Sequence, residues 1–216
     1  MTSVVDPPLD CALCPRLSGF IATWRQKEPG WHNGPVPTWL PPEGEGAVRL
    51  LIVGLAPGLR GANRTGRPFT GDASGETLFG ALDRHGLALG HRPGTAGAGV
   101  ELVATAITNA VRCVPPENRP IAAEINNCRA YLEPTLARFE NLQTVLALGK
   151  IAHEACIRAL GGTVSAHRFA HGAQTALNGV TVVSSYHCSR YNMNTGRLTE
   201  AMFDAVMADI VETVER

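Results

Sequence analysis

The chain has 216 residues, of which 44% are hydrophobic, and this is the size and composition of one domain with a normal apolar core. It carries 19 basic and 19 acidic side chains, so its net charge of zero gives no sign of a polyanionic partner. The sequence contains no apolar run long enough for a membrane helix and no signal-peptide pattern at its start, so we expect a cytoplasmic protein without membrane contact.

The first part of the chain is predicted to form one helix and one irregular connector. Residues 11–28 open with a C-x-x-C pattern and continue as an amphipathic helix. Its apolar stripe consists of Leu17, Phe20, Ile21 and Trp24. Residues 29–46 are rich in proline and glycine, which indicates an irregular connector packed on the surface.

The rest of the chain alternates strands with helices. Strands are predicted at residues 48–54, 100–107, 144–149 and 180–186, and helices at residues 74–89, 121–139, 150–160 and 199–214. The helix over residues 121–139 is expected to kink or restart at Pro134. A hairpin could lie within residues 161–179. This order predicts an α/β fold, a three-layer α/β/α sandwich with a central four-stranded parallel sheet.

Three loops with unusual composition follow predicted strands. They comprise residues 54–72, 109–120 and 187–197. Parallel sheets of this kind bind ligands outside the carboxyl ends of their strands. We therefore expect the three loops to meet at one edge of the sheet and to share a site.

The first loop contains residues suited to binding a ligand. Gly54, Ala56 and Gly58 let the backbone approach a ligand closely, although no P-loop ending follows them. Phe69 lies between proline and glycine residues, where its ring could stack on a base or plug the core beneath the loop. Asp72 precedes a predicted helix and could be only the N-cap of that helix.

The second and fourth predicted strands are followed by polar residues. The carboxamide of Asn109 offers two donors and one acceptor in a plane, which matches the N3–H and O4 edge of uracil and mismatches cytosine. His187, close to Ser189 and Arg190, could donate a hydrogen bond to a developing oxyanion. Taken singly, each of these residues also has a structural interpretation.

Four of the six cysteines form a candidate metal centre. Cys11 and Cys14 make the C-x-x-C pattern, whereas Cys113 and Cys128 are dispersed. Four thiolates can hold a zinc ion or a [4Fe–4S] cluster, and one compact pair with two dispersed ligands favours the cluster. Unrelated free thiols are the remaining alternative. Cys156 is most simply a core residue.

Several strings together resemble a known family. GLAPG, GANRTGRPFTGD, TNAVRC and NTGRLT look like the uracil-DNA glycosylase superfamily, and within it the iron–sulfur family 5, or B-type, branch. The resemblance spans residues 11–212. It implies an α/β/α fold with a [4Fe–4S] cluster held by Cys11, Cys14, Cys113 and Cys128.

The resemblance also implies an activity and roles for the site residues. The activity would be hydrolysis of the N-glycosidic bond of uracil in DNA, and of other deaminated or modified bases such as hypoxanthine or ethenocytosine. Phe69 would stack on the flipped base, Asn109 would read its edge and His187 would stabilise it as it departs. Family 4 enzymes have an acid where Leu55 stands, so Asp72 becomes the candidate for assisting water or the sugar cation.

The remaining expectations concern DNA contacts and organisation. Gly54, Ala56, Gly58, Ser189 and Arg190 would contact the DNA, and Arg190 or a neighbour would fill the gap in the base stack. We expect residues 1–216 to form one domain, with an N-terminal cluster-binding segment, that acts as a monomer on DNA containing uracil or another modified base.

One departure from the family pattern affects the second motif. The family has His-Pro-Ser, whereas this chain has Cys188 between His187 and Ser189. Without the proline, φ is free and an amide donor is added, so the turn could be more mobile and a thiol could lie near the active site. A tolerated substitution is the simpler interpretation.

Three other functions would explain parts of the sequence. The first is a cluster-bearing protein that binds or senses damaged DNA without cleaving it, as the change at Cys188 would allow. The second is an electron-transfer or redox-sensing protein, which leaves the strand-edge loops unexplained. The third is a nucleotide hydrolase, which would need clusters of metal-binding acids that the sequence lacks.

Overall fold

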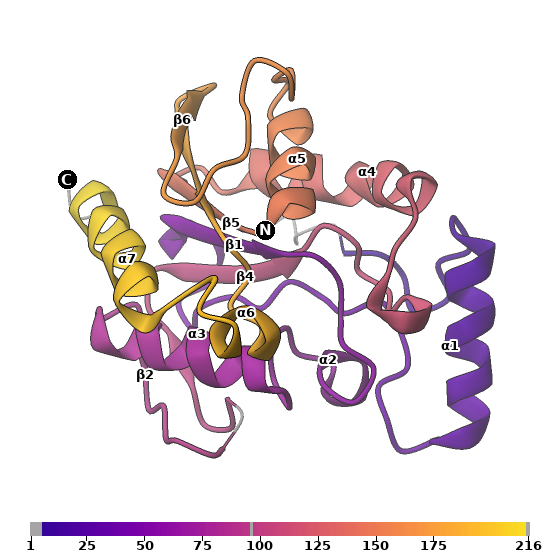
Figure 1. The fold of residues 1–216 in the computed structure, drawn as a ribbon. Helices are drawn as coiled ribbons and strands as arrows, with labels where there is room; N and C mark the ends of the chain where they lie inside the picture. The colour runs from indigo at the N-terminus through magenta and orange to yellow at the C-terminus, as the bar shows by residue number, and fades with distance from the viewer. Residues whose placement is uncertain (1–5, 96, 215–216) are drawn as a thin grey trace.

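The computed structural model describes residues 6–95 and 97–214 and contains a five-stranded, mainly parallel sheet between two layers of helices (Figure 1). The strand order is β4-β1-β5-β7-β6. The strands, in that order, are Thr105–Asn109, Leu50–Gly54, Thr144–Leu148, Val180–Ser185 and Gln174–Leu177. The predicted α/β/α fold and its four parallel strands are confirmed. The fifth strand, β6, pairs antiparallel with β7. The hairpin expected within residues 161–179 therefore forms later, between β6 and the predicted fourth strand.

Strand β1 is buried on both faces of the sheet. Leu50 and Ile52 belong to a core shared with α3 (Ala73–Arg84) and α7 (Glu200–Val214). Leu51 and Val53 belong to a core shared with α4 (Ala122–Arg138) and α5 (Lys150–Ala159). Successive side chains of a strand point to opposite faces, so an uninterrupted apolar run suits a strand covered on both sides. Figure 1 shows these two helix pairs on opposite sides of the sheet.

The N-terminal helix α1 (Pro15–Lys27) stands beside the sandwich rather than on the sheet (Figure 1). It buries Leu17 and Ile21 in a third, smaller core together with Val111 and Val114. The connector is irregular as predicted, apart from the 3-10 turn η1 (Glu45–Ala47) and an isolated bridge between Trp39 and Ile107. The small core thus joins α1 to the segment that follows β4.

Two predicted elements were wrong in their extent. The helix expected over residues 74–89 ends at Arg84, because Gly86 at φ 71° turns the chain back into β2 (Ala88–Leu89). The strand expected over residues 100–107 is divided at Ala104, whose φ is 48°. Its first part, β3 (Glu101–Leu102), pairs antiparallel with β2 in a separate small sheet.

Short helices also interrupt the long loops. The loop after β1 contains α2 (Ala62–Thr65), the turn after β4 contains η2 (Pro116–Asn118), and the loop after β7 contains α6 (Arg190–Asn194). Helix α4 continues through Pro134 as one helix. In the part of the chain that the structure describes, no helix is both long and apolar enough to cross a membrane.

Candidate active site and four-cysteine centre

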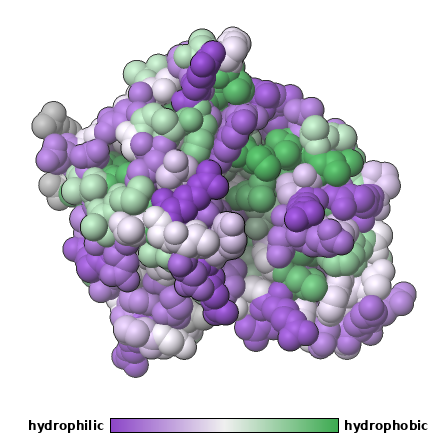
Figure 2. All heavy atoms as spheres, in the orientation of Figure 1, coloured by the Kyte–Doolittle hydropathy of each residue, from purple (hydrophilic) through white to green (hydrophobic). Residues whose placement is uncertain are grey.

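A cavity of about 280 Å³ lies at the carboxyl edge of the sheet, and all three predicted loops contribute to its walls. It is lined by Leu55, Ala56, Pro57, Gly58, Ala62, Phe69, Asp72, Ser74, Asn109, Asn118, His187 and Ser189. Figure 2 shows the molecular surface hollowed near the middle of this face, with hydrophobic residues along the hollow. The loops therefore meet as expected.

Asn109 and Gly54 lie side by side at the ends of neighbouring strands. They are partners in the parallel register of β4 and β1, and Asn109 is 3% exposed. A Cβ added to Gly54 would lie 2.5 Å from Asn109 Oδ1 and 2.7 Å from Phe69 Cζ. Gly54 thus leaves room for both side chains, although it does not itself line the cavity.

Phe69 has a backbone conformation that is rare for a bulky residue. Its φ is 59°, in the left-handed region, and such strain is often found at functional sites. A Cβ on Gly75 would lie 1.9 Å from the Phe69 carbonyl oxygen, so only glycine allows this approach of the loop to α3. The ring lines the cavity and stacks near-parallel to His187, with 5.9 Å between ring centroids and 22° between planes.

The carboxylate of Asp72 caps a helix and also faces the cavity. Its Oδ1 accepts hydrogen bonds from the amides of Ser74 (2.9 Å) and Gly75 (3.1 Å) at the start of α3. Its Oδ2 lies on the side of Gly58 and Gly61. Burial raises the pKa of Asp72, and the two amide hydrogen bonds lower it by less. The N-cap interpretation is therefore correct and leaves one oxygen available to a ligand.

His187 is held as a neutral imidazole. Burial lowers the pKa of His187 to about 4, because the charged form loses its hydration. The backbone of its turn is anchored by Asn192, whose Nδ2 donates to the His187 carbonyl oxygen (2.8 Å). Ser189 Oγ in turn accepts from the Asn192 amide (3.3 Å) and caps α6. A neutral imidazole can donate one hydrogen bond into the cavity.

The thiol of Cys188 does not line the active site. Its side chain is fully buried in the core beneath the turn, and its Sγ donates to the Ser74 carbonyl oxygen at 3.5 Å. Burial raises the pKa of Cys188 to about 12, with a further contribution from the charge of Asp72. The thiol thus lies near the site, as expected, but in the core beneath the cavity rather than in the cavity wall.

Two predicted site residues do not line the cavity, and some residues that were not predicted do line it. Arg190 begins α6 on the exposed surface and, like Gly54, is not part of the cavity wall. Sequence reasoning missed Asn118, which reaches the rim from the 115–120 turn with a φ of 56°. Two signals could have identified it. It lies in a loop already expected at this edge, and asparagine tolerates a left-handed backbone.

The four predicted cysteine ligands surround a second, apolar cavity. Cys11 and Cys14 line it from the N-terminal segment, Cys113 from the segment that follows β4, and Cys128 from α4. The other lining residues are Pro7, Leu13, Leu17, Val111 and Tyr131. Within residues 6–95 and 97–214, no group of three or more histidine, cysteine or acidic side chains is placed to hold a single metal ion.

Three hydrogen-bonding groups lie against these sulfur atoms. The Arg112 amide donates to Cys128 Sγ (3.2 Å), and Asn127 Nδ2 donates to Cys14 Sγ (3.8 Å). The Tyr131 hydroxyl lies 3.6 Å from Cys11 Sγ, with either group able to donate. Burial raises the pKa of Cys113 to about 12, so a thiolate there needs a nearby positive charge such as a metal. Donors to sulfur and a dry, sulfur-lined cavity fit a thiolate-bound centre.

Comparisons with known proteins agree with the resemblance seen in the motifs. The family model described as the uracil DNA glycosylase superfamily matches residues 41–211. A type-5 uracil-DNA glycosylase of Thermus thermophilus is 42% identical over 211 residues, covering 92% of this chain and 91% of that protein. One of Pyrobaculum aerophilum is 43% identical over 199 residues, covering 90% of this chain and 85% of that protein. The chain therefore belongs to the uracil DNA glycosylase superfamily.

Proposed function

We propose that this protein is a uracil-DNA glycosylase of DNA repair, a hydrolase that cleaves the N-glycosidic bond of uracil in DNA. The observation that carries this proposal is the convergence of Asn109, His187 and Asp72 on one cavity. The cavity joins an amide that matches the uracil edge, a neutral donor and a carboxylate. A base inside a duplex cannot reach such a cavity, so the target nucleotide must flip out of the stack.

His187 would act on the departing base. Cleavage of the bond between C1′ and N1 leaves negative charge on uracil and positive charge on the sugar. A neutral imidazole donates a hydrogen bond to the uracil oxygen O2 as that charge develops, and such a preorganised donor contributes about 3–4 kcal/mol. Because the pKa of His187 is about 4, the ring is in the neutral form at physiological pH.

Asp72 would act on the sugar side of the same bond. Its free Oδ2 can stabilise the cationic sugar or orient the attacking water, which gives its hydroxyl group to C1′ and its proton to the base. Oδ1 is fixed by the two amides at the start of α3, so the carboxylate is held in place before the substrate arrives. This preorganisation is what electrostatic stabilisation requires.

The exposed start of α6 would occupy the space that the flipped base leaves. Arg190 is exposed, and Tyr191 next to it is 72% exposed. Both follow Ser189 at the cavity wall. We assign the filling of the base stack to Arg190 together with this neighbour.

We extend the proposed substrates to other deaminated or modified bases. Hypoxanthine presents N1–H and O6 in the same donor–acceptor order as N3–H and O4 of uracil, so the Asn109 amide can read both. Ethenocytosine lacks that edge and would depend on stacking against Phe69. Much of the remaining wall is small or apolar, with Leu55, Ala56, Pro57 and Ala62 among its members.

We propose a [4Fe–4S] cluster held by Cys11, Cys14, Cys113 and Cys128. One compact C-x-x-C pair and two dispersed cysteines, all lining one apolar cavity, support a cluster over zinc. The hydrolysis moves no electrons, so the cluster would brace the loops near the DNA rather than take part in the reaction. The chain would act as a monomer and as one domain, with residues 6–14 as its cluster-binding segment.

Asp72→Asn and His187→Ala are expected to lower the rate of uracil excision about 100-fold or more while binding to uracil-containing DNA is retained. Asparagine keeps the N-cap acceptor, so the first change tests the charge rather than the helix. Single-turnover cleavage of a uracil oligonucleotide measures the rate, and a gel shift measures binding. Asp204→Asn, a distant and partly exposed acid, is the control. Wild-type rates in both site variants would refute the assignment.

The excision rate is expected to fall as the pH drops through the pKa of Asp72. Burial raises that pKa above the usual 3.8, so the fall lies at a higher pH than an ordinary aspartate would give. The residual activity of Asp72→Asn should lack the part of the decline that protonation of this carboxylate causes. Single-turnover rates measured against pH test both statements, and the same acid limb in wild type and Asp72→Asn would contradict the role of Asp72.

Asn109→Ala is expected to reduce excision of uracil and hypoxanthine together, by about tenfold or more, because one amide reads the same edge on both bases. Excision of ethenocytosine should change less. Rates on three oligonucleotides that differ only in the target base provide the measurement. A loss confined to uracil would argue against shared recognition of the two deaminated bases.

Protein purified without oxygen is expected to be brown and to contain about four irons per chain. Serine in place of Cys113 should remove most of the iron, whereas serine in place of Cys156, which is buried in another core, should not. Iron and zinc analysis of the three proteins gives the result. Stoichiometric zinc without iron would overturn the cluster.

A further inference from the structure

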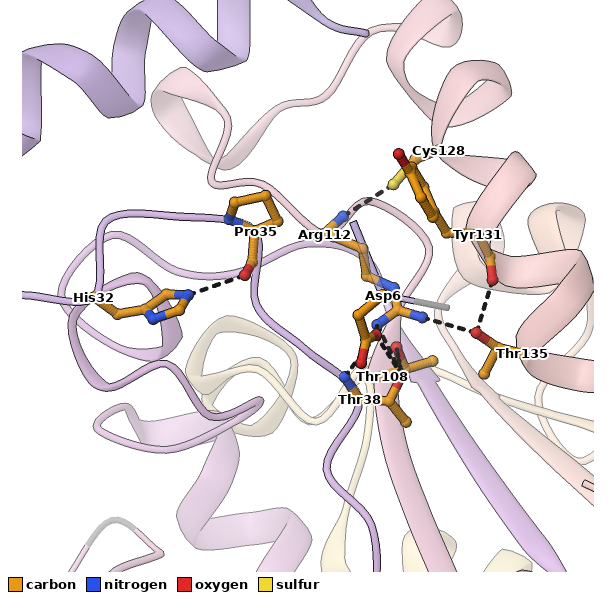
Figure 3. Close-up of polar contacts among 9 residues, drawn as sticks. All are labelled: Asp6, His32, Pro35, Thr38, Thr108, Arg112, Cys128, Tyr131 and Thr135. Atoms are coloured by element: carbon orange, nitrogen blue, oxygen red, sulfur yellow. Dashed lines mark hydrogen bonds and ion pairs between the residues drawn. The ribbon is translucent and has the colours of Figure 1, made fainter. Parts of the chain in front are cut away.

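Arg112 is the largest fully buried side chain that the structure describes, at 1% exposure, and it immediately precedes a cluster ligand (Figure 3). Its Nη1 donates to Asp6 Oδ1 (2.7 Å) and to Thr38 Oγ1 (2.8 Å). Its Nη2 donates to Thr135 Oγ1 (3.2 Å). A buried charge is costly unless it is paired and hydrogen-bonded, so the function of this arrangement needs an explanation.

The partners of Arg112 come from segments far apart in the sequence. Asp6 belongs to the N-terminal segment, Thr38 to the connector and Thr135 to α4. Asp6 also accepts from the amide and the hydroxyl of Thr38, both at 3.0 Å. The amide of Arg112 meanwhile donates to Cys128 Sγ. Figure 3 shows Asp6, Thr38 and Thr135 around the guanidinium of Arg112, and Cys128 beside its backbone amide.

The segment that Asp6 begins forms one wall of the cysteine cavity. Residues 6–14 contain no helix or strand and contribute Pro7, Cys11, Leu13 and Cys14 to the cavity. Just beyond the other end of this segment, in the first turn of α1, Arg16 makes two hydrogen bonds with Glu124, each 2.8 Å long. Between the two ends, Leu9 and Leu13 accept side-chain hydrogen bonds at exposed positions. Charged pairs therefore fix the segment at both ends.

The two ends differ in which partner is buried. Arg112 is 1% exposed and its partner Asp6 is 25% exposed. Arg16 is 39% exposed, whereas Glu124 is 3% exposed. Loss of Asp6 would therefore leave the buried charge of Arg112 without a carboxylate partner, which is costly. Cys113 and Cys128, at 9% and 7% exposure, line the same cavity as this segment.

We propose that the Asp6–Arg112 ion pair is a clasp that holds the N-terminal segment closed over the four-cysteine centre and thereby controls the release of its metal. The inference rests on the proposed metal centre and adds a positioning role for two residues outside its ligands. The clasp controls the access of solvent to the centre. When the ion pair breaks, Cys11 and Cys14 move away together, and Cys113 and Cys128 become exposed to solvent.

The test compares wild type with Asp6→Asn and with Asp204→Asn. The control breaks a partly exposed ion pair between Arg84 and Asp204, whose 2.8 Å length is close to that of the clasp. Each protein, as purified, is mixed with an iron chelator and iodoacetamide. Loss of visible absorbance gives the rate of iron release, and mass spectrometry gives the rate of alkylation at each cysteine.

Asp6→Asn is expected to release iron about tenfold faster or more, and to be alkylated faster at Cys113 and Cys128. Cys156, which is fully buried in a different core, should stay protected in all three proteins. Asp204→Asn should behave as wild type. Adding Arg112→Met to Asp6→Asn should recover part of the loss, because it removes the unpaired charge.

Three results would overturn the clasp. These are wild-type rates of release and alkylation in Asp6→Asn, equal acceleration in Asp204→Asn, and alkylation of Cys156 at the same rate as Cys113, which would indicate general unfolding. Protein that contains no iron would contradict the proposed cluster instead. Alkylation at Cys113 relative to Cys156 would still decide whether Asp6 holds the segment closed.

Discussion

The parallel pairing of β1 with β4 is the constraint on which the rest of this structure depends. It places Gly54 beside Asn109 at the end of two buried strands and delivers the loops 54–72 and 109–120 to one edge. Strand β7, two positions away across β5, brings the turn with His187 to the same edge. The site is therefore assembled by backbone hydrogen bonds in the centre of the sheet, and the loops supply the chemistry.

Burial has opposite effects on the two proposed catalytic groups. In each case it disfavours the charged form, so it raises the pKa of Asp72 and lowers that of His187. The histidine becomes a reliable neutral donor over the physiological pH range. For Asp72, hydrogen bonds from two amides of α3 counteract part of the effect of burial and favour the ionised carboxylate. The helix that this residue caps is thus part of the electrostatics of the site.

The sequence alone predicted the features of the structure that depend on hydrophobic periodicity and on the position of the loops. The apolar run of β1 predicted a strand covered on both faces, and the C-x-x-C pattern with two dispersed cysteines predicted thiols that now surround one cavity. The convergence of Asn109 and His187 followed from strand order alone. These features depend on local pattern and on topology, which the order of residues carries.

Other features depend on conformations that composition does not reveal. Ala104 at a positive φ divides one predicted strand into two, although nothing about alanine suggests it. The side chain of Cys188 points into the core because of how its turn packs. The backbone of Phe69 has a positive φ, and its carbonyl oxygen lies where a Cβ on residue 75 would stand. The burial of Arg112 depends on partners from three distant segments.

The absence of a side chain at Gly54 has a consequence for the entropy of binding. The side chains of Asn109 and Phe69 occupy the space in which any other residue at position 54 would place its Cβ. Both side chains are buried, at 3% and 8% exposure, so they have little rotamer freedom left to lose when a base enters. Immobilising a flexible side chain on binding would cost about 0.5–1.5 kcal/mol, and a base that contacts these two groups avoids most of that cost.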